Sequence, residues 1–106
     1  MAQETAPGIS FQWDTGNVQH IISDYPTRGN TTNEVESLFT DPALASLPDR
    51  VDSKGEQRYK AVGCSNLNRI LYVAFSYRNG QVRPISCRPA SRKERERYAQ
   101  IIQDSR

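Results

Sequence analysis

The chain has few of the residues on which most metal sites and many enzyme mechanisms depend. It contains two cysteines and one histidine among 106 residues. Two cysteines do not make a disulfide framework, and together with His20 they fall short of the four ligands of a structural zinc site. We therefore expect Cys64 and Cys87 to be free thiols in a reducing cytosol, and no metal or other cofactor. The single histidine also excludes a two-histidine acid/base mechanism.

Long apolar runs and glycine-rich phosphate loops are also missing. No segment approaches the roughly 20 apolar residues that cross a bilayer, and residues 1–10 lack the basic start and apolar run of a signal peptide. We accordingly expect a cytoplasmic protein that does not associate with membranes. The sequence contains no G-x-x-x-x-G-K-[ST], G-x-G-x-x-G or H-E-x-x-H motif, which argues against the common nucleotide-binding folds and zinc peptidases.

Charge is divided unevenly between the two halves of the chain. Residues 1–53 hold two basic and eight acidic residues, a balance of −6, whereas residues 54–106 hold twelve basic and four acidic residues, a balance of +8. This asymmetry favours a polyanionic partner for the C-terminal half. A solvated basic helix over residues 92–97, with ion pairs at i,i+3 and i,i+4, explains the same charges equally well.

The first half is predicted to contain one short strand and two helices. Residues 1–10 are predicted to form a disordered arm, although residues 9–13 also alternate apolar and polar side chains, as a strand does. Asp14 suits the N-cap of a short amphipathic helix, and Thr31 with Glu34 fits the capping box of a second one. Asp41-Pro42 ends this second helix, because the residue before proline avoids helical geometry.

The second half is predicted to form an antiparallel sheet followed by a helix. Residues 43–47 fit a short strand closed by a turn at Pro48-Asp49, and residues 49–56 fit a loop. Further strands are predicted over residues 58–63, 69–78 and 81–88, the last two joined by the hairpin signal Asn79-Gly80. Ser91 and Glu94 fit a capping box before a helix over residues 92–103. This order predicts one α+β domain over residues 11–106, with a small antiparallel sheet flanked by helices.

Arginines on strands are the feature that bears most directly on function. Arg58, Arg83 and Arg88 fall on predicted strands or at their ends, where a guanidinium is costly to hold without an anionic partner. Arginine suits a phosphate clamp better than proton transfer. Arg83 and Arg88 are five residues apart, so they share a face only if Pro84 creates a bulge or Arg88 lies past the strand end. The alternative is that these arginines pair with carboxylates, namely those of Glu56, Glu94 or Asp41.

Several motifs resemble those of the BrnT family of bacterial toxins. The first half carries Phe11-x-Trp13-Asp14, Gly16-Asn17-x-x-His20-Ile21 and Glu34-Val35-Glu36-x-x-Phe39-x-Asp41-Pro42. The second half carries Gly55-Glu56-x-Arg58-Tyr59, Leu71-x-Val73-x-Phe75, Arg83-x-Ile85-Ser86-x-Arg88-Pro89-Ala90 and Glu94-x-x-x-Tyr98. The resemblance runs from Phe11 to Tyr98, and the motif that begins at Arg83 is its most specific part.

This resemblance implies a ribonuclease toxin of a bacterial type II toxin–antitoxin pair, with a RelE-like fold. Such a toxin would cleave RNA without a metal ion and so inhibit translation and growth. Its partner would be a BrnA-type antitoxin with a ribbon-helix-helix DNA-binding domain, which neutralises the toxin and represses their shared operon. The family's conserved arginines fall on Arg58, Arg83 and Arg88, its glutamate falls on Glu56, and the aromatic residue of its last helix falls on Tyr98.

The roles of these residues follow from the cleavage that the resemblance implies. The three arginines would stabilise negative charge on the phosphorane, with Glu56 as the base and His20 or Tyr98 as the acid. Three basic residues at the start of the last helix are further RNA-binding candidates, namely Arg92, Lys93 and Arg95.

Two positions depart from the family pattern and keep other functions open. Arg28-Gly29 stands where many relatives have His-Gly, and Asn17 stands where others have lysine. One alternative is a module that binds RNA or the antitoxin without turnover. Another is a structural domain whose arginines only hold the sheet against acidic loops. The complete set of three arginines favours the enzyme.

Overall fold

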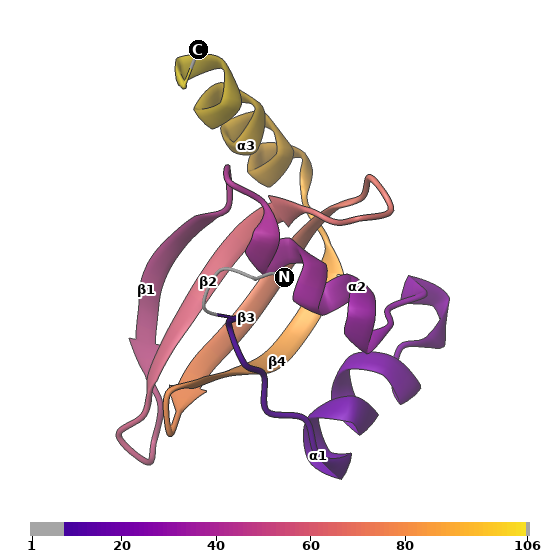
Figure 1. The fold of residues 1–106 in the computed structure, drawn as a ribbon, viewed down its shortest axis with the longest axis vertical. Helices are drawn as coiled ribbons and strands as arrows, with labels where there is room; N and C mark the ends of the chain where they lie inside the picture. Colours follow the sequence, from indigo (N-terminus) through magenta and orange to yellow (C-terminus); the bar gives the residue numbers. More distant parts are fainter. Residues whose placement is uncertain (1–7, 106) are drawn as a thin grey trace, which may run out of the picture.

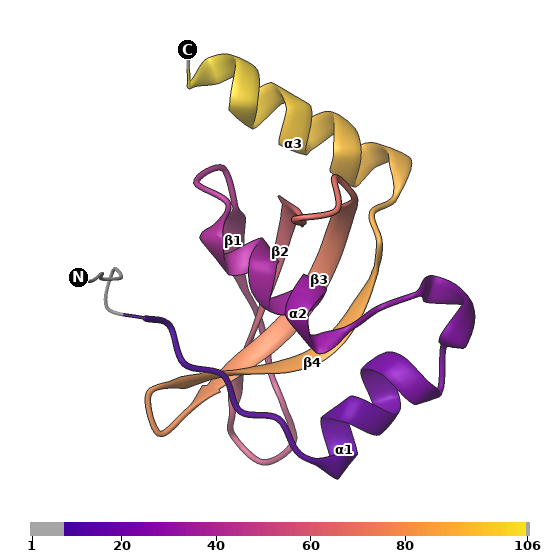
Figure 2. The ribbon, with the colours of Figure 1, turned by 45° about the vertical axis from the view of Figure 1, so that its right-hand side comes forward.

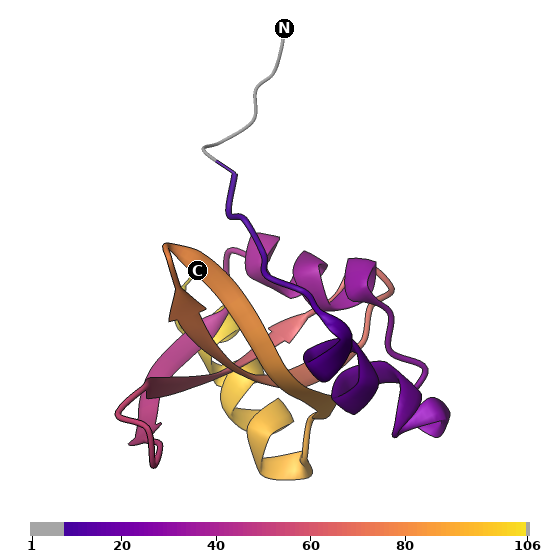
Figure 3. The ribbon, with the colours of Figure 1, turned by 90° about the horizontal axis from the view of Figure 1, so that it is seen from below.

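A four-stranded sheet with helices on both faces makes up the described part of the chain (Figures 1 and 3). The computed structural model describes residues 8–105. The strands are antiparallel and adjacent in sequence order: β1 (Ala45–Val51), β2 (Gln57–Cys64), β3 (Ile70–Arg78) and β4 (Gln81–Pro89). The helical segments are α1 (Thr15–Val18), η1 (Gln19–Ser23), η2 (Pro26–Arg28), α2 (Thr32–Ser37), η3 (Leu38–Thr40) and α3 (Arg92–Asp104). The predicted α+β class with an antiparallel sheet is confirmed. Its likeness to the RelE fold stays a prediction.

The hairpin between β3 and β4 forms where the sequence predicts it. Asn79 and Gly80 both have positive φ, at 53° and 77°, as the two central residues of a type I′ turn require. The prediction that β4 is an edge or bulged strand is confirmed in both respects. β4 ends the sheet, and its register with β3 shifts beside Pro84.

β1 is longer than predicted and runs through Pro48-Asp49, so the turn predicted there is wrong. Pro48 faces Tyr59 of β2, and the register shifts between Pro48 and Val51. β1 is an edge strand, where a proline can be accommodated because its missing N–H need not break a ladder. The loop predicted over residues 49–56 begins only after Val51.

The strand predicted over residues 9–13 is reduced to one parallel bridge, between Phe11 and Val82. Backbone hydrogen bonds join Val82 to Ser10 and to Gln12, after which the chain turns away because Asp14 caps α1. Residues 1–7 of the predicted arm lie outside the described residues.

The predicted caps of α1 and α3 are confirmed, and the predicted capping box of α2 is only half formed. Asp14 caps α1, and Ser91 with Glu94 forms the predicted capping box of α3. Thr31 caps α2 through the Glu34 amide. The Glu34 side chain does not complete that box, because it is buried beneath α2 and pairs with Arg69 instead.

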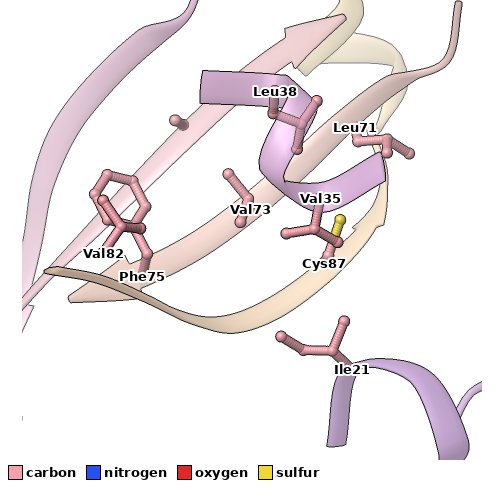
Figure 4. Close-up of a cluster of buried hydrophobic side chains, with 9 residues drawn as sticks. Ile21, Val35, Leu38, Leu71, Val73, Phe75, Val82 and Cys87 are labelled. Carbon is pink, nitrogen blue, oxygen red and sulfur yellow. The ribbon is translucent and has the colours of Figure 1, made fainter. Parts of the chain in front are cut away.

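The core lies between one face of the sheet and the segments α1–η1 and α2–η3 (Figure 4). Ile21 of η1 and Val35 of α2 are fully buried, and so are Leu71 and Val73 of β3. Cys87 also lies in this core, and burial raises the pKa of its thiol to about 12. Cys64 and Cys87 are both free thiols, as predicted.

The helix α3 lies at one end of the other face and leaves the remainder of that face without a helix among the described residues (Figures 2 and 3). Tyr98 and Ile101 of α3 border a small apolar hollow of about 90 Å³ against β1 and β2. Within residues 8–105, no helix has the length and apolar character that a membrane span requires.

A buried ion pair joins α2 to the start of β3. The Glu34 side chain is 1 % exposed and accepts hydrogen bonds from Nε of Arg69 at 2.8 Å and from the Ser65 hydroxyl at 2.7 Å. These hydrogen bonds, that of Arg69 above all, hold the pKa of Glu34 below its usual value. A second Arg69 nitrogen donates to the Arg28 carbonyl at 2.7 Å. The pair therefore fixes α2 and the turn before it against the sheet.

Removing one partner of this pair should destabilise the fold. Arg69→Met leaves the buried Glu34 carboxylate uncompensated, and we expect the free energy of unfolding to fall by about 3 kcal/mol. Urea denaturation measures the change. The matched control is Arg92→Met, because the Arg92 and Glu96 side chains are 86 % and 63 % exposed and such pairs contribute little. Equal losses in the two variants would contradict a special role for the buried pair.

Candidate functional site

A β-bulge in β4 brings the predicted arginines to one face of the sheet. Phe75 pairs with Pro84 and Ala74 pairs with Ser86, so Ile85 is an extra residue in β4. As a result Arg83 lies opposite Ser76 and Arg88 lies opposite Tyr72, and residues 72 and 76 of β3 point to the same face. The bulge on which the sequence prediction depended is present.

Arg58 lies on this same face. Tyr59 pairs with Phe75, so in the antiparallel register Arg58 lies beside Ser76 and points to the same side of the sheet. Arg58 and Arg83 therefore flank Ser76 from the two neighbouring strands. Arg88 lies four residues away along β3, about 13 Å at the rise of a strand.

An open hollow of about 200 Å³ lies where α1 and η1 meet this face, at the end away from α3. Three arginines and one carboxylate line it, and Asp14 and Asp52, outside the lining, pair with two of these arginines. We call it the arginine hollow, and its lining residues are Gly16, Asn17, His20, Glu56, Arg58, Arg78, Arg83, Pro84 and Ile85. It brings together four of the six predicted catalytic residues: His20, Glu56, Arg58 and Arg83.

Arg83 is held by the N-cap of α1. Its guanidinium donates to the two carboxylate oxygens of Asp14 at 2.8 and 3.2 Å and to Gln12 at 3.2 Å. The Arg83 side chain is 14 % exposed, whereas that of Asp14 is 53 % exposed. The hydrogen bond from Arg83 is the main cause that holds the pKa of Asp14 below its usual value. Arg83 is thus oriented from its solvent side by Asp14.

Arg58 and Ser76 keep unused hydrogen-bonding capacity beside the hollow. Arg58 donates to Asp52 at 3.1 Å through one terminal nitrogen. Its buried Nε and the buried Ser76 hydroxyl have no hydrogen-bond partner among residues 8–105. Buried polar groups are usually satisfied, so these two atoms are exceptions next to the hollow.

Glu56 faces Arg78, a residue that the sequence reasoning missed. Nε of Arg78 donates to Glu56 at 2.8 Å, and this hydrogen bond is the main cause that keeps the pKa of Glu56 below its usual value. Glu56 is therefore ionised at neutral pH but is a weak base while Arg78 is bound. The alternation of β3 could have revealed Arg78, because it lies two residues after Ser76 on the same face.

His20 reaches the hollow from η1. Its Nδ1 lies 3.9 Å from a carboxylate oxygen of Asp24, and the imidazole is 48 % exposed. The imidazole also packs edge to face on Tyr25, with 5.7 Å between ring centroids. The His20 imidazole is thus accessible at the rim of the hollow.

Asn17, at the position of the family lysine, has a structural role here. It is 4 % exposed, and its side-chain nitrogen donates to the carbonyls of Gln12 and Pro84 at 2.9 and 3.0 Å. Its side-chain oxygen accepts from the Asp14 amide at 2.8 Å. Asn17 thereby ties the cap of α1 to the bulge of β4.

Arg88 and Tyr98 lie outside the lining of the arginine hollow. Arg88 forms two hydrogen bonds to Glu94 of α3, at 2.8 and 3.0 Å, and stacks on Tyr72. Tyr98 donates a hydrogen bond to Asp41, and burial, with that hydrogen bond, raises the pKa of its hydroxyl far above the usual value. Both side chains attach α3 to the rest of the chain.

The predicted RNA-binding residues at the start of α3 are all exposed. Arg92 pairs with Glu96 at 3.1 Å, and Arg95 donates to the Ala90 carbonyl at 2.7 Å. Arg28, which stands at the position of the family histidine, donates to the Cys87 carbonyl at 3.0 Å. Among residues 8–105, no three His, Cys, Asp or Glu side chains gather as metal ligands would.

Comparison with known protein families agrees with the resemblance found in the sequence. Residues 13–94 match the family model described as "Ribonuclease toxin, BrnT, of type II toxin-antitoxin system". The matched segment begins just before α1 and ends in the first turn of α3, so it includes the complete arginine hollow. No curated protein matches the chain.

The Arg88–Glu94 ion pair should make the stability of the protein depend on pH in the acid range. Arg88 lowers the pKa of Glu94 to about 2, from an ordinary 4.5. The stabilisation is therefore complete above about pH 4.5 and is lost as the pH falls towards 2. Glu94→Gln keeps a capping side chain but removes this charge. It should lower the melting temperature at pH 7, and the difference from wild type should shrink on acidification.

Thermal unfolding from pH 7 to pH 2.5 measures this difference. The control is Glu96→Gln, which removes an exposed carboxylate from the same helix and should change the melting temperature little at any pH. A difference between Glu94→Gln and wild type that stays constant over this range would show that the Glu94 charge contributes nothing.

Proposed function

Since the chain belongs to the BrnT family of ribonuclease toxins of type II toxin–antitoxin systems, we propose that it cleaves RNA in the arginine hollow. The observation that carries this proposal is the register of β4. The hairpin register sets Arg83 opposite Ser76 and so beside Arg58 on the open face, with Glu56, Arg78 and His20 around them. A group of guanidinium donors suits a phosphodiester.

The proposed reaction needs no metal ion. The 2′-oxygen attacks the adjacent phosphorus, and the bond between phosphorus and the 5′-oxygen breaks. The products are a 2′,3′-cyclic phosphate and a free 5′-hydroxyl. Negative charge accumulates on the non-bridging oxygens at the pentavalent stage. Arg58 and Arg83 stabilise this charge, because fixed cations need no reorganisation as it develops. Arg58 donates to Asp52 through only one terminal nitrogen, so its other terminal nitrogen is the donor for this purpose.

Two proton transfers accompany the cleavage. Glu56 takes the proton of the 2′-hydroxyl, and His20 delivers one to the departing 5′-oxygen. The bond from Arg78 limits the basicity of Glu56. A bound phosphate that draws Arg78 towards itself weakens this bond and makes Glu56 a stronger base. Arg78 thus joins the proposed site as the residue that couples substrate binding to the base.

The remaining predicted residues receive supporting roles. Arg88 and Tyr98 position α3 through Glu94 and Asp41. The exposed Arg92, Lys93 and Arg95 bind the RNA backbone beyond the cleaved bond. The toxin acts in the cytoplasm, where unneutralised cleavage arrests translation and growth.

The proposed partner is a BrnA-type antitoxin with a ribbon-helix-helix DNA-binding domain. An acidic segment of this antitoxin competes with RNA for the positive face. A module that binds RNA or antitoxin without turnover stays an alternative. One observation favours another candidate, a structural domain whose arginines hold the sheet against acidic loops. Arg83 and Arg58 already have carboxylate partners within the chain, Asp14 and Asp52.

Alanine variants of the hollow distinguish cleavage from these alternatives. Arg58→Ala and Arg83→Ala should each lower the single-turnover rate of RNA cleavage about 100-fold, as loss of one transition-state donor does, with the melting temperature nearly unchanged. Arg83→Lys should recover only part of the rate, because an ammonium cannot form the planar two-point contact. Cleavage should persist in EDTA. In cells, wild type without antitoxin should stop growth, and Arg83→Ala should not.

The matched control is Asp14→Asn, which breaks the pair with Arg83 but keeps a residue that caps helices well. It should retain most of the activity if Arg83 acts on RNA. If Arg83→Ala and Asp14→Asn lose stability equally, and activity follows the folded fraction in both, Arg83 is structural and the assignment fails.

A further inference from the structure

An exposed tyrosine stands at the rim of the arginine hollow, in the turn between η1 and α2. Tyr25 is 38 % exposed and immediately precedes η2. The turn lies beside α1 in the ribbon views (Figures 1 and 2). Neither the family pattern nor the proposed cleavage explains a large exposed ring here.

One face of the ring is already in contact with a guanidinium. Cζ of Arg28 lies 3.7 Å from the Tyr25 ring centroid. The guanidinium is fixed from behind, because it donates to the Cys87 carbonyl of β4 at 3.0 Å. The Arg28 amide also donates to the Tyr25 carbonyl at 3.0 Å, which closes the turn. The ring and the cation are thus ordered before any ligand arrives, so binding costs little conformational entropy.

His20 connects this stack to the arginine hollow. The His20 and Tyr25 rings meet edge to face, with 5.7 Å between centroids, and His20 is itself part of the lining of the hollow. A ligand that extends from Arg83 past His20 therefore reaches Tyr25 next. Arg83 in the hollow and Tyr25 beyond His20 therefore fit a phosphate and a nearby base of one RNA strand.

We infer that Tyr25 binds an unpaired nucleobase of the RNA whose phosphate occupies the arginine hollow. This inference rests on the proposed function and adds a second subsite to it. Aromatic side chains backed by arginine are common stacking surfaces for single-stranded RNA, and such stacking tolerates every base. The Tyr25 subsite therefore holds the strand in place and prefers single-stranded RNA to duplex, whose bases are not free to stack.

Binding of a non-cleavable RNA tests the subsite. The probes are single-stranded 2′-O-methyl hexanucleotides with 2-aminopurine at each position in turn, because the blocked 2′-oxygen cannot attack. Wild type should bind them and quench 2-aminopurine at one position. Tyr25→Phe keeps the ring and should behave like wild type. Tyr25→Leu keeps an apolar side chain without the ring and should bind about 10-fold more weakly, without that quenching and with the same melting temperature.

Two controls make the result specific. Tyr77→Leu removes another exposed tyrosine, which lies on the core face of β3 beside Phe75, and should keep wild-type affinity. Arg83→Ala reports on the hollow itself. If Tyr25→Leu binds and quenches like wild type while Arg83→Ala binds weakly, the Tyr25 subsite is wrong and the proposed function stands.

The other outcomes also decide between the possibilities. If wild type binds none of the hexanucleotides, the inference and the proposed function both fail. If Tyr25→Leu loses affinity only in proportion to a fall in melting temperature, the stack is structural. If it keeps RNA affinity but no longer copurifies with the antitoxin, the ring is a protein contact and the inference is overturned.

Discussion

The register of the β3–β4 hairpin determines which side chains can act together. The Asn79-Gly80 turn sets Arg83 opposite Ser76 and so beside Arg58. Ile85 has no counterpart in β3, so Arg88 points to the same face as Arg83 although they are five residues apart. Without that bulge Arg88 would point to the core face, whereas Arg83 would keep its place in the hollow. The bulge is itself anchored, because Asn17 donates to the Pro84 carbonyl and also accepts from the Asp14 amide. Asp14 in turn holds Arg83.

Polar contacts add to the apolar core in connecting the helices to the sheet. Glu34 and Arg69 fix α2, Arg88 and Glu94 fix α3, and Asn17 fixes α1. Each contact joins segments far apart in the chain and demands a particular geometry, since an unpaired partner would be costly. The result is a positive face whose arginines are already oriented by carboxylates. A phosphate that binds there exchanges one anionic partner for another, which needs little rearrangement.

The sequence predicts the local features well because local rules determine them. The Asn79-Gly80 hairpin follows from turn chemistry, and the capping box of α3 follows from residue spacing. Strand alternation shows that Arg83 and Arg88 share a face only if β4 is bulged or ends before Arg88. These local rules cannot predict which residues pair when they lie far apart in the sequence. Glu34 fits a capping box by spacing but pairs with Arg69, Pro48 reads as a turn but lies in an edge strand, and Arg78 becomes significant only because Glu56 faces it. Sequence reasoning named Arg58, Arg83, Glu56 and His20, and it named Glu94 as a partner for these arginines, which Arg88 confirms. It did not name Asp14 and Asp52, which orient Arg83 and Arg58.

The most direct measurement is an NMR titration with non-cleavable 2′-O-methyl RNA that follows the side-chain Nε–H resonances of the arginines. If RNA binds in the arginine hollow, the signals of Arg58, Arg78 and Arg83 shift first and furthest. The signal of Arg69, which is engaged with the buried Glu34, stays in place. Shifts confined to the arginines of α3, with those of Arg58 and Arg83 unchanged, would contradict the central claim that RNA binds where the register of β2, β3 and β4 gathers these side chains.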